Sequence, residues 1–351
     1  MSLTVISPRM EDAADNERLT RVLSYALNDI QANILYTAEE LQNLTGQRIL
    51  FAIALGRYGI NPEYQRMLAK LRSCPELLRG CVAGLVVDGS GELYTKSTAT
   101  ELTLAANLSG CSFVGRPLVE GTGSLTNFRI QSDLLHTDLE GAYLAAAREL
   151  AQRLLDFTPP KKVRPELLVL HASTRHVSNS MDLWEYVKQR VSPYCNITEI
   201  GLRNGTLSDC SGCPYTMCLH FGEKGGCFYG GVMQEEVYPA VRRADAILMV
   251  CPNYNDALSA NLTAFINRLT ALFRQTRFYD KALFSIVVSG YSGGDIVSRQ
   301  LVSALNMNKS FWLPQNFALI ETANDPGAAL SLPGIEARLD LFSRNILNTL
   351  T

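Results

Sequence analysis

The sequence predicts a parallel α/β protein made of two tandem units. Short apolar runs alternate with amphipathic segments through most of the chain, which is the pattern of strand–helix–strand crossovers onto a parallel sheet. The 351 residues also exceed the usual range of a single hydrophobic core, and a proline-rich stretch at 156–166 interrupts the alternation. We therefore expect one domain at 1–157 and a second at 158–351, with the linker at their junction.

The elements of the first unit can be assigned in order from periodicity and capping signals. Apolar residues at helical spacing within 10–35 predict an amphipathic helix, and a capping box of Thr37 and Glu40 predicts a second, short helix. The apolar run 48–55 predicts a buried strand, and Asn61 followed by Pro62 predicts the start of the next helix. The alternation continues with a strand at 82–89, a helix at 97–108, a strand at 111–121 and a helix at about 138–156.

The second unit repeats this order. Residues 167–191 can be laid over 49–71 as strand, turn and helix, and residues 245–269 can be laid over 82–108 in the same way. Identity is low, and the grammar that all α/β units share could produce this match without a gene duplication. Either origin predicts two similar units in tandem.

Composition and charge exclude several classes of protein. Lys and Arg number 32 against 34 Asp and Glu, so the chain is near neutral and nucleic acid is not an expected partner. The apolar runs are too short for a membrane span, and the start of the chain turns acidic where a signal peptide would be apolar. The nine cysteines are an odd count, and several lie among apolar neighbours as buried free thiols would. We expect a cytoplasmic protein, with no membrane partner, that forms a homo-oligomer.

The loop after the strand at 167–170 is rich in groups that bind phosphate. Hydroxyls, an amide and one guanidinium run directly into a helix, whose backbone N–H groups favour an anion. Helix capping alone would explain part of this composition, but four hydroxyls and an arginine exceed what a cap requires. The candidate phosphate-binding residues are Ser173, Arg175, Ser178, Asn179 and Ser180.

Two further loops follow strands of the second unit. Pro252, Asn253, Tyr254 and Asn255 combine a turn with an exposed flat ring, which suits a planar heteroaromatic ligand, although an ordinary turn with a packed tyrosine would have the same sequence pattern. The segment Ser289, Gly290, Tyr291, Ser292, Gly293 is glycine-rich, so its backbone could approach a ligand closely. Ligands in open α/β sheets bind beyond the carboxyl ends of the strands, where all of these loops lie.

Together the three loops resemble the flavodoxin-like family of FMN-dependent reductases, which includes NAD(P)H-dependent FMN and quinone reductases and iron–sulfur flavoproteins. The resemblance covers about residues 166 to 325 and is most specific at 173–180 and 252–255. It implies a five-stranded flavodoxin-like sheet, FMN as cofactor and NAD(P)H as co-substrate. It also implies that 173–180 hold the flavin phosphate, while 252–255 and 289–294 border the isoalloxazine. Thr263 and Asn267 stand where many of these reductases carry Lys and Asp.

Four cysteines cluster in the segment 209–227, which lies between the second and third strands of this unit. The iron–sulfur branch of the family carries a compact cysteine motif in the same place, so the resemblance implies that a [4Fe–4S] cluster could bind here. The spacing C-x2-C-x4-C-x8-C is looser than that motif, and a zinc ion or a set of free, redox-active thiols would also be consistent with it. The candidate metal ligands are Cys210, Cys213, Cys218 and Cys227.

The sequence therefore predicts an FMN-dependent oxidoreductase in which the flavin, and no catalytic side chain, carries the chemistry. Its partners would be small-molecule or protein electron donors and acceptors. The rival hypothesis is a non-catalytic flavin- or nucleotide-binding regulator or scaffold. The first unit carries no recognisable FMN site. Asp88, Glu92, Glu120 and Ser124 lie at the ends of its strands and could line a site, although such residues are more often caps and turns.

Overall fold

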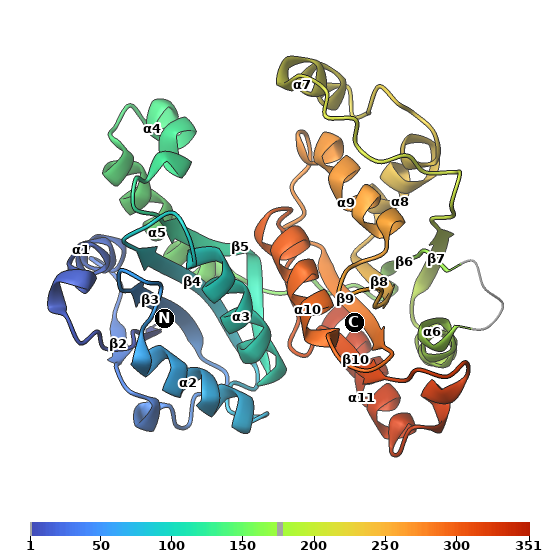
Figure 1. Ribbon diagram of the computed structural model, residues 1–351, viewed down its shortest axis with the longest axis horizontal. Coiled ribbons are helices and arrows are strands. Elements are labelled where there is room, and N and C mark those ends of the chain that lie inside the picture. Colours follow the sequence, from blue (N-terminus) through green and yellow to red (C-terminus); the bar gives the residue numbers. More distant parts are fainter. Residues whose placement is uncertain (1, 174–177) are drawn as a thin grey trace. The chain divides into compact units, whose positions relative to one another are not determined.

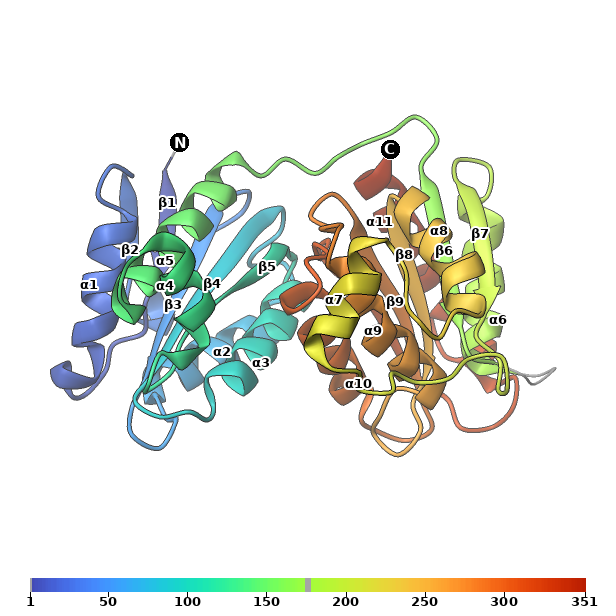
Figure 2. The ribbon, with the colours of Figure 1, turned by 90° about the horizontal axis from the view of Figure 1, so that it is seen from above.

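The computed structural model describes residues 2–173 and 178–351. The chain divides into two compact units, Met1–Thr158 and Pro159–Thr351. Each unit is a parallel five-stranded sheet with helices on both faces (Figures 1 and 2). This is the fold class that the alternation of apolar and amphipathic segments predicts.

The first unit has strands and helices in regular alternation. Its strands are β1 (Leu3–Ile6), β2 (Ala32–Leu35), β3 (Arg48–Leu55), β4 (Cys81–Gly89) and β5 (Cys111–Gly121). Its helices are α1 (Glu17–Ala26), α2 (Pro62–Ser73), α3 (Thr95–Leu108), α4 (Arg129–Leu135) and α5 (Leu139–Asp156).

The second unit follows after a segment without helix or strand between α5 and Glu166, where the sequence predicts a linker. Its strands are β6 (Glu166–His171), β7 (Asn196–Gly201), β8 (Ala246–Pro252), β9 (Ala282–Ser289) and β10 (Ala318–Thr322). Its helices are α6 (Asn179–Val191), α7 (Tyr215–Glu223), α8 (Tyr238–Arg243), α9 (Ala260–Phe273), α10 (Gly294–Leu301) and α11 (Ile335–Leu350).

The two sheets have the same strand order. They run β2-β1-β3-β4-β5 and β7-β6-β8-β9-β10, so in each unit the second strand forms one edge and is followed by the first, third, fourth and fifth. All pairs are parallel. This is the flavodoxin-like order. The direction in which successive strands are added to the sheet reverses between its first and third strands, and ligands of such sheets bind at that point. The predicted pair of tandem flavodoxin-like units is confirmed.

The same order shows where the expected elements of the first unit were wrong. The segment 10–35 is not one helix, because α1 spans only Glu17–Ala26 and the short strand β2 follows it. The strand β1 at Leu3–Ile6 was also missed. Both strands have four residues, which is too short for a period to stand out from the flanking sequence. The second predicted helix is a single 3-10 turn at Ala38–Glu40, although its capping box is present.

The missed strands shift the correspondence between the units by one crossover. Laying 167–191 over 49–71 matches β6 with β3, whereas the strand order matches β6 with β1 and β8 with β3. The first-unit counterpart of the predicted phosphate loop is therefore 7–16, and not the loop after β3. The loops after β3 and β4 correspond to the predicted flavin-ring loops.

Helices cover both faces of each sheet in the same way. In the first unit α1 packs against α5, and α2 packs against α3 across the sheet from them (Figure 1). In the second unit α6 packs against α11, while α8, α9 and α10 lie on the other face. The apolar residues of β3, β4, β8 and β9 are buried between these layers, as near-continuous apolar strands of a parallel sheet should be.

The described residues contain no helix that is both long enough and apolar enough to span a membrane. The expected cytoplasmic location stays a prediction.

Candidate active site

The carboxyl edge of the second sheet brings the predicted loops together. β6 and β9 are the two neighbours of β8 in the sheet, with His171 opposite Val250 and Pro252 opposite Val288. The chain therefore leaves these three strands side by side, and the loops that begin at 172, 253 and 290 share one edge.

The predicted phosphate loop leads from β6 into α6. Ser178 is the N-cap residue of α6, and its hydroxyl lies 3.2 Å from that of Ser180, which is buried. Among the described residues, the side chain of Ser178 accepts no capping hydrogen bond from a backbone N–H of the first turn. Ser173 is half-buried at the start of the loop, whereas Arg175 lies outside the described residues. The first backbone N–H groups of α6 can therefore still donate hydrogen bonds to an anion.

The side chain of Asn179, at the start of α6, makes three hydrogen bonds to distant parts of the second unit. Its Nδ2 donates to the carbonyls of Ala323 and Asp325 at 3.0 and 2.9 Å, and its Oδ1 accepts from the backbone N of Ala329 at 3.1 Å. The side chain thus ties the start of α6 to the segment after β10. Its predicted contact with phosphate would have to come from its backbone N–H.

The loop after β8 forms a tight two-residue turn. Asn255 and Asp256 have φ values of 55° and 57°, and Tyr254 and Ala257 exchange backbone hydrogen bonds across them. Two successive positive φ values define a type I′ turn, for which Asn and Asp are favoured residues. The turn presents Tyr254, whose side chain is 54% exposed, at the edge of the sheet.

Asn253 joins the two loops that were predicted to border the flavin ring. Its backbone N donates to Val288, and its Nδ2 lies 3.1 Å from the hydroxyl of Ser289, 3.0 Å from the carbonyl of Ser292 and 3.2 Å from Asp256 Oδ1. Each of these partners belongs to one of the two loops. The loops therefore form one connected unit, with Tyr254 and the 81% exposed Tyr291 projecting from it.

Gly293 is required by this junction. Its φ is +85°, which a residue with a Cβ adopts only under strain, and a Cβ there would collide with Asp256 and lie 2.9 Å from Asn253 Nδ2. The glycine that the sequence marked as permitting close approach to a ligand is thus also the residue that lets the two loops touch.

Three buried polar atoms at this edge have no partner among the described residues. They are Nδ1 of His171 at the end of β6, Oδ1 of Asn253 after β8, and Oγ of Ser259, the N-cap residue of α9. Burial without a hydrogen bond is costly, so such atoms are rare unless another molecule or a local change satisfies them. A hydroxyl-bearing and amide-bearing ligand such as FMN offers the missing donors and acceptors, and the residues at this edge therefore fit it.

His171 and Ser259 were not found by sequence reasoning. Burial lowers the pKa of His171, although Glu199, 3.7 Å away, raises it in opposition. Its position as the last residue of β6 was the signal that could have singled it out.

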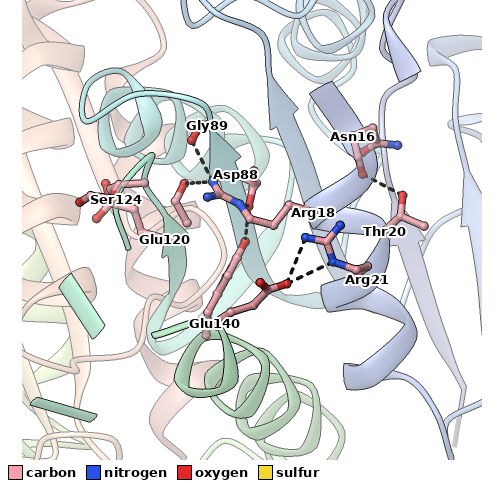
Figure 3. A network of polar contacts seen from close by, with 12 residues as sticks. Asn16, Arg18, Thr20, Arg21, Asp88, Gly89, Glu120, Ser124 and Glu140 are labelled. Atoms are coloured by element: carbon pink, nitrogen blue, oxygen red, sulfur yellow. Dashed lines mark hydrogen bonds and ion pairs between the residues drawn. The ribbon is translucent and has the colours of Figure 1, made fainter. Parts of the chain in front are cut away.

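An ion pair between a half-buried arginine and a buried aspartate lies at the end of β4 in the first sheet. Arg18 of α1 forms a bidentate contact with Asp88 at 2.9 and 3.0 Å, and it also donates to the carbonyl of Gly89 at 2.9 Å (Figure 3). Tyr143 of α5 donates to the same carboxylate at 3.0 Å. Asp88 is only 4% exposed, whereas a cavity of about 190 Å³ remains at the loops after β3 and β4, where Leu55, Gly89 and Tyr94 are among its lining residues.

Burial is the largest single influence on the pKa of both groups in this pair. Burial raises the pKa of Asp88, against the opposing effects of Arg18 and Tyr143. Burial lowers the pKa of Arg18, but the carboxylate outweighs it and the net shift is upward. The bidentate geometry favours an ionised pair at neutral pH, because a guanidinium with two short contacts stabilises the carboxylate form. The interpretation of Asp88 as a cap or turn residue was wrong.

The neighbouring polar residues have local roles. Glu120 accepts from the hydroxyl of Thr95 at 2.6 Å, and Glu92 accepts from the backbone N of Ser124 at 2.7 Å. The loop at 7–16, which corresponds to the predicted phosphate loop, contains several acids, and Asp12 caps the backbone N of Ala14. Carboxylates in this place repel a phosphate.

The four clustered cysteines of the second unit line a single cavity of about 120 Å³ beside α9. Even so, no three His, Cys, Asp or Glu side chains within 2–173 and 178–351 are arranged to hold a metal ion. The two findings are compatible, because four residues can line one cavity without their sulfur atoms converging on a single point, as ligands of a metal ion must. The four thiols thus share a cavity but are not arranged as ligands of an iron–sulfur cluster.

Comparison with known families assigns the second unit. Residues 165–325 match the family model described as NADPH-dependent FMN reductase. This segment of the second unit is therefore similar to that family, over somewhat less than half of the chain. The match includes all the loops at the carboxyl edge, and the members of this reductase family are flavin-dependent oxidoreductases.

Solved structures with related folds cover about half of the chain. An azoreductase from Bacillus anthracis str. Sterne is 17% identical, with 52% of this chain and 99% of that chain covered and a TM-score of 0.38. A NAD(P)H:quinone oxidoreductase from Methanothermobacter marburgensis is 16% identical, with 53% and 96% covered and a TM-score of 0.39. A comparison with curated proteins finds no match. The assignment of the reductase-family unit rests on the family model and on its strand order.

Proposed function

We propose that the second unit binds FMN beyond the carboxyl ends of β6, β8 and β9 and acts as a NAD(P)H-dependent oxidoreductase. The observation that carries this proposal is the junction at Asn253, which joins the two predicted flavin-ring loops inside the segment that matches the reductase family. Because a reduced flavin can pass electrons to many small acceptors, a quinone and a nitro compound are the acceptors to test first.

Each loop has a separate part in this function. The start of α6, with Ser173, Arg175, Ser178 and Ser180, would hold the phosphate through backbone N–H groups and hydroxyls. Tyr254 and the backbone of 289–293 would border the ring, and Asn253 would keep the two loops at a fixed separation. The flavin supplies hydride and electron transfer when bound, so the side chains orient it and exclude water from it.

The test is flavin binding followed by reduction. Titration of the purified chain with FMN should quench flavin fluorescence to saturation, and NADPH or NADH should then bleach the flavin absorbance in the absence of oxygen. A chain that does not bind FMN would contradict the proposal. A bound flavin that stays oxidised with both nucleotides would favour the rival hypothesis, a flavin-binding regulator or scaffold.

We also propose that the first unit binds no flavin. The Arg18–Asp88–Tyr143 cluster occupies the end of β4, and acids occupy the loop that would face a phosphate. Its role would then be to dock a partner or a second copy of the chain in a homo-oligomer. Light scattering of the purified protein measures the oligomeric state, and a monomer at micromolar concentration would contradict the homo-oligomer.

The iron–sulfur cluster stays a prediction from the resemblance. Assays of iron and acid-labile sulfide on protein purified without oxygen test it directly. About four irons per chain would be the count for a [4Fe–4S] centre.

A further inference from the structure

The nine cysteines fall into two groups that differ in accessibility. Those in or beside the strands are buried, and burial raises their pKa values, to about 11 in the case of Cys195. Buried thiols of this kind are poor nucleophiles because the thiolate is the reactive form. The buried group is Cys81, Cys111, Cys195 and Cys251.

Four of the remaining cysteines gather at one place outside the proposed flavin site. Cys210 is exposed and Cys213 half-buried on the stretch before α7, while Cys218 lies on α7 and Cys227 follows it. All four line the 120 Å³ cavity, together with α9 residues and the aromatic rings of Phe221, Phe228 and Tyr229. The fold thus collects accessible thiols instead of dispersing them.

The segment is fastened to α9 at both ends. Arg268, which is 4% exposed, donates to the carbonyl of Gly230 at 2.8 Å and to that of Ser208 at 3.5 Å. Asn267 donates to Asp209 at 2.9 Å, and the backbone N of Cys227 donates to Gln234 at 3.1 Å. These contacts fix the entry and exit of the cysteine segment, so its thiols are held at the cavity.

Arg268 is among the residues that line the cavity, and the described lining residues include no Asp or Glu. Asp209, the nearest acid in sequence, accepts hydrogen bonds from Asn267 and from the backbone N of Cys210.

We propose that Cys210 and Cys213 form a dithiol that exchanges with disulfides. They are spaced C-x2-C, the arrangement typical of thiol–disulfide oxidoreductases, with the exposed cysteine first and the less exposed one three residues later. The Cys210 thiolate attacks a disulfide of a small molecule or protein, forming a mixed disulfide and releasing one thiol. Cys213 then loses its proton and attacks Cys210 Sγ, which closes the internal disulfide and releases the second thiol. Two electrons pass from the dithiol to the disulfide substrate.

The substrate of this exchange is external and is not the flavin. Asn267 lies seven residues beyond the start of α9 at Ala260, and at 1.5 Å per residue this is about 10 Å from the flavin-facing end of the helix. The cavity therefore lies along the side of α9, away from the edge proposed for FMN. This activity goes beyond the proposed oxidoreductase function and does not depend on it.

The test uses glutathione disulfide as probe on the full chain, purified without oxygen, with free thiols counted by alkylation and mass spectrometry. The wild-type chain should release two glutathione thiols and acquire a Cys210–Cys213 disulfide. Cys213→Ser should release one thiol and keep one glutathione on Cys210, because the resolving thiol is missing. Cys210→Ser should release none in the same time, and Cys74→Ser, the control, should react as wild type does.

Several results would overturn the proposal. Glutathione trapped on Cys218 or Cys227 in the Cys213→Ser variant would place the attacking thiol elsewhere. Protein that carries four irons or one zinc per chain, with all four cysteines protected from alkylation, would show that they are metal ligands. Wild-type thiols that do not react with the probe would exclude the exchange.

Discussion

The two units share one strand order but differ at the edge where such sheets bind ligands. In the second unit, a junction at Asn253 joins two loops, and buried polar atoms there have no partner among the described residues. In the first unit, Arg18 and Tyr143 satisfy the buried carboxylate of Asp88 at the corresponding end of β4. Two edges with the same backbone topology thus differ in their polar groups, which one unit satisfies with its own side chains and the other leaves partly without a partner among the described residues.

The largest effect is expected when the ion pair of Arg18 and Asp88 in the first unit is broken. Arg18→Met leaves Asp88 buried without its cation, and breaking a buried pair in this way costs about 3–5 kcal/mol. We expect the free energy of unfolding, measured with denaturant, to fall by about that amount. The double variant Arg18→Met/Asp88→Leu should recover part of the loss, because no charge is left buried although the hydroxyl of Tyr143 loses its acceptor. Equal stability of the single variant and the wild type would contradict the buried pair.

The next effect concerns the junction of the second unit. Gly293→Ala should weaken FMN binding about tenfold or more, since the new Cβ collides with Asp256 in addition to the strain of about 1–2 kcal/mol at positive φ. Gly205→Ala is the matched control, because Gly205 has nearly the same φ of +84° and open space around it. Fluorescence titration with FMN should separate the two variants. Similar affinities would mean that the contact with Asp256 is unimportant.

A smaller effect is expected when only the hydrogen bonds of the junction are removed. Asn253→Ala deletes the amide that holds Ser289, Ser292 and Asp256, and each bond contributes about 0.5–1.5 kcal/mol. FMN affinity should fall severalfold. Ser289→Ala, which removes one partner, should have an intermediate effect in the same titration. A larger loss of FMN affinity in Ser289→Ala than in Asn253→Ala would contradict the central role of Asn253 at this junction.

The smallest effect is a pH dependence at His171. Because burial lowers its pKa below the value of about 6.5 in an unfolded chain, the unfolded state binds the proton more readily. Stability from this group is therefore complete above about pH 6.5 and declines as the pH falls from there toward the native pKa. His171→Gln should flatten the unfolding free energy across this acid range, as measured by denaturation at a series of pH values. An unchanged slope would assign the dependence to another group.

The sequence predicts the elements of this fold where apolar runs are long, and it fails where they are short. β3, β4 and β5 were predicted with nearly their observed bounds, since each has eight or more residues. β1 and β2 have four residues each and were not predicted, and this omission displaced the predicted correspondence between the units by one crossover.

The candidate site shows the same division. The loops at 252–255 and 289–293 were predicted from turn chemistry and glycine content, which are local properties of sequence. The use of Asn179 as a bridge to Ala323 and Ala329, and the pairing of Arg18 with Asp88, depend on residues far apart in the chain. Local patterns cannot reveal such partners, because long-range packing decides them.

The most direct test of the difference between the units is the number of FMN molecules bound per chain, measured by ultrafiltration and flavin absorbance at saturation. We expect one FMN per chain, bound more weakly in Gly293→Ala and unchanged in Arg18→Met. Two FMN per chain would contradict the proposal that the first unit binds no flavin, and none would contradict the proposed site of the second.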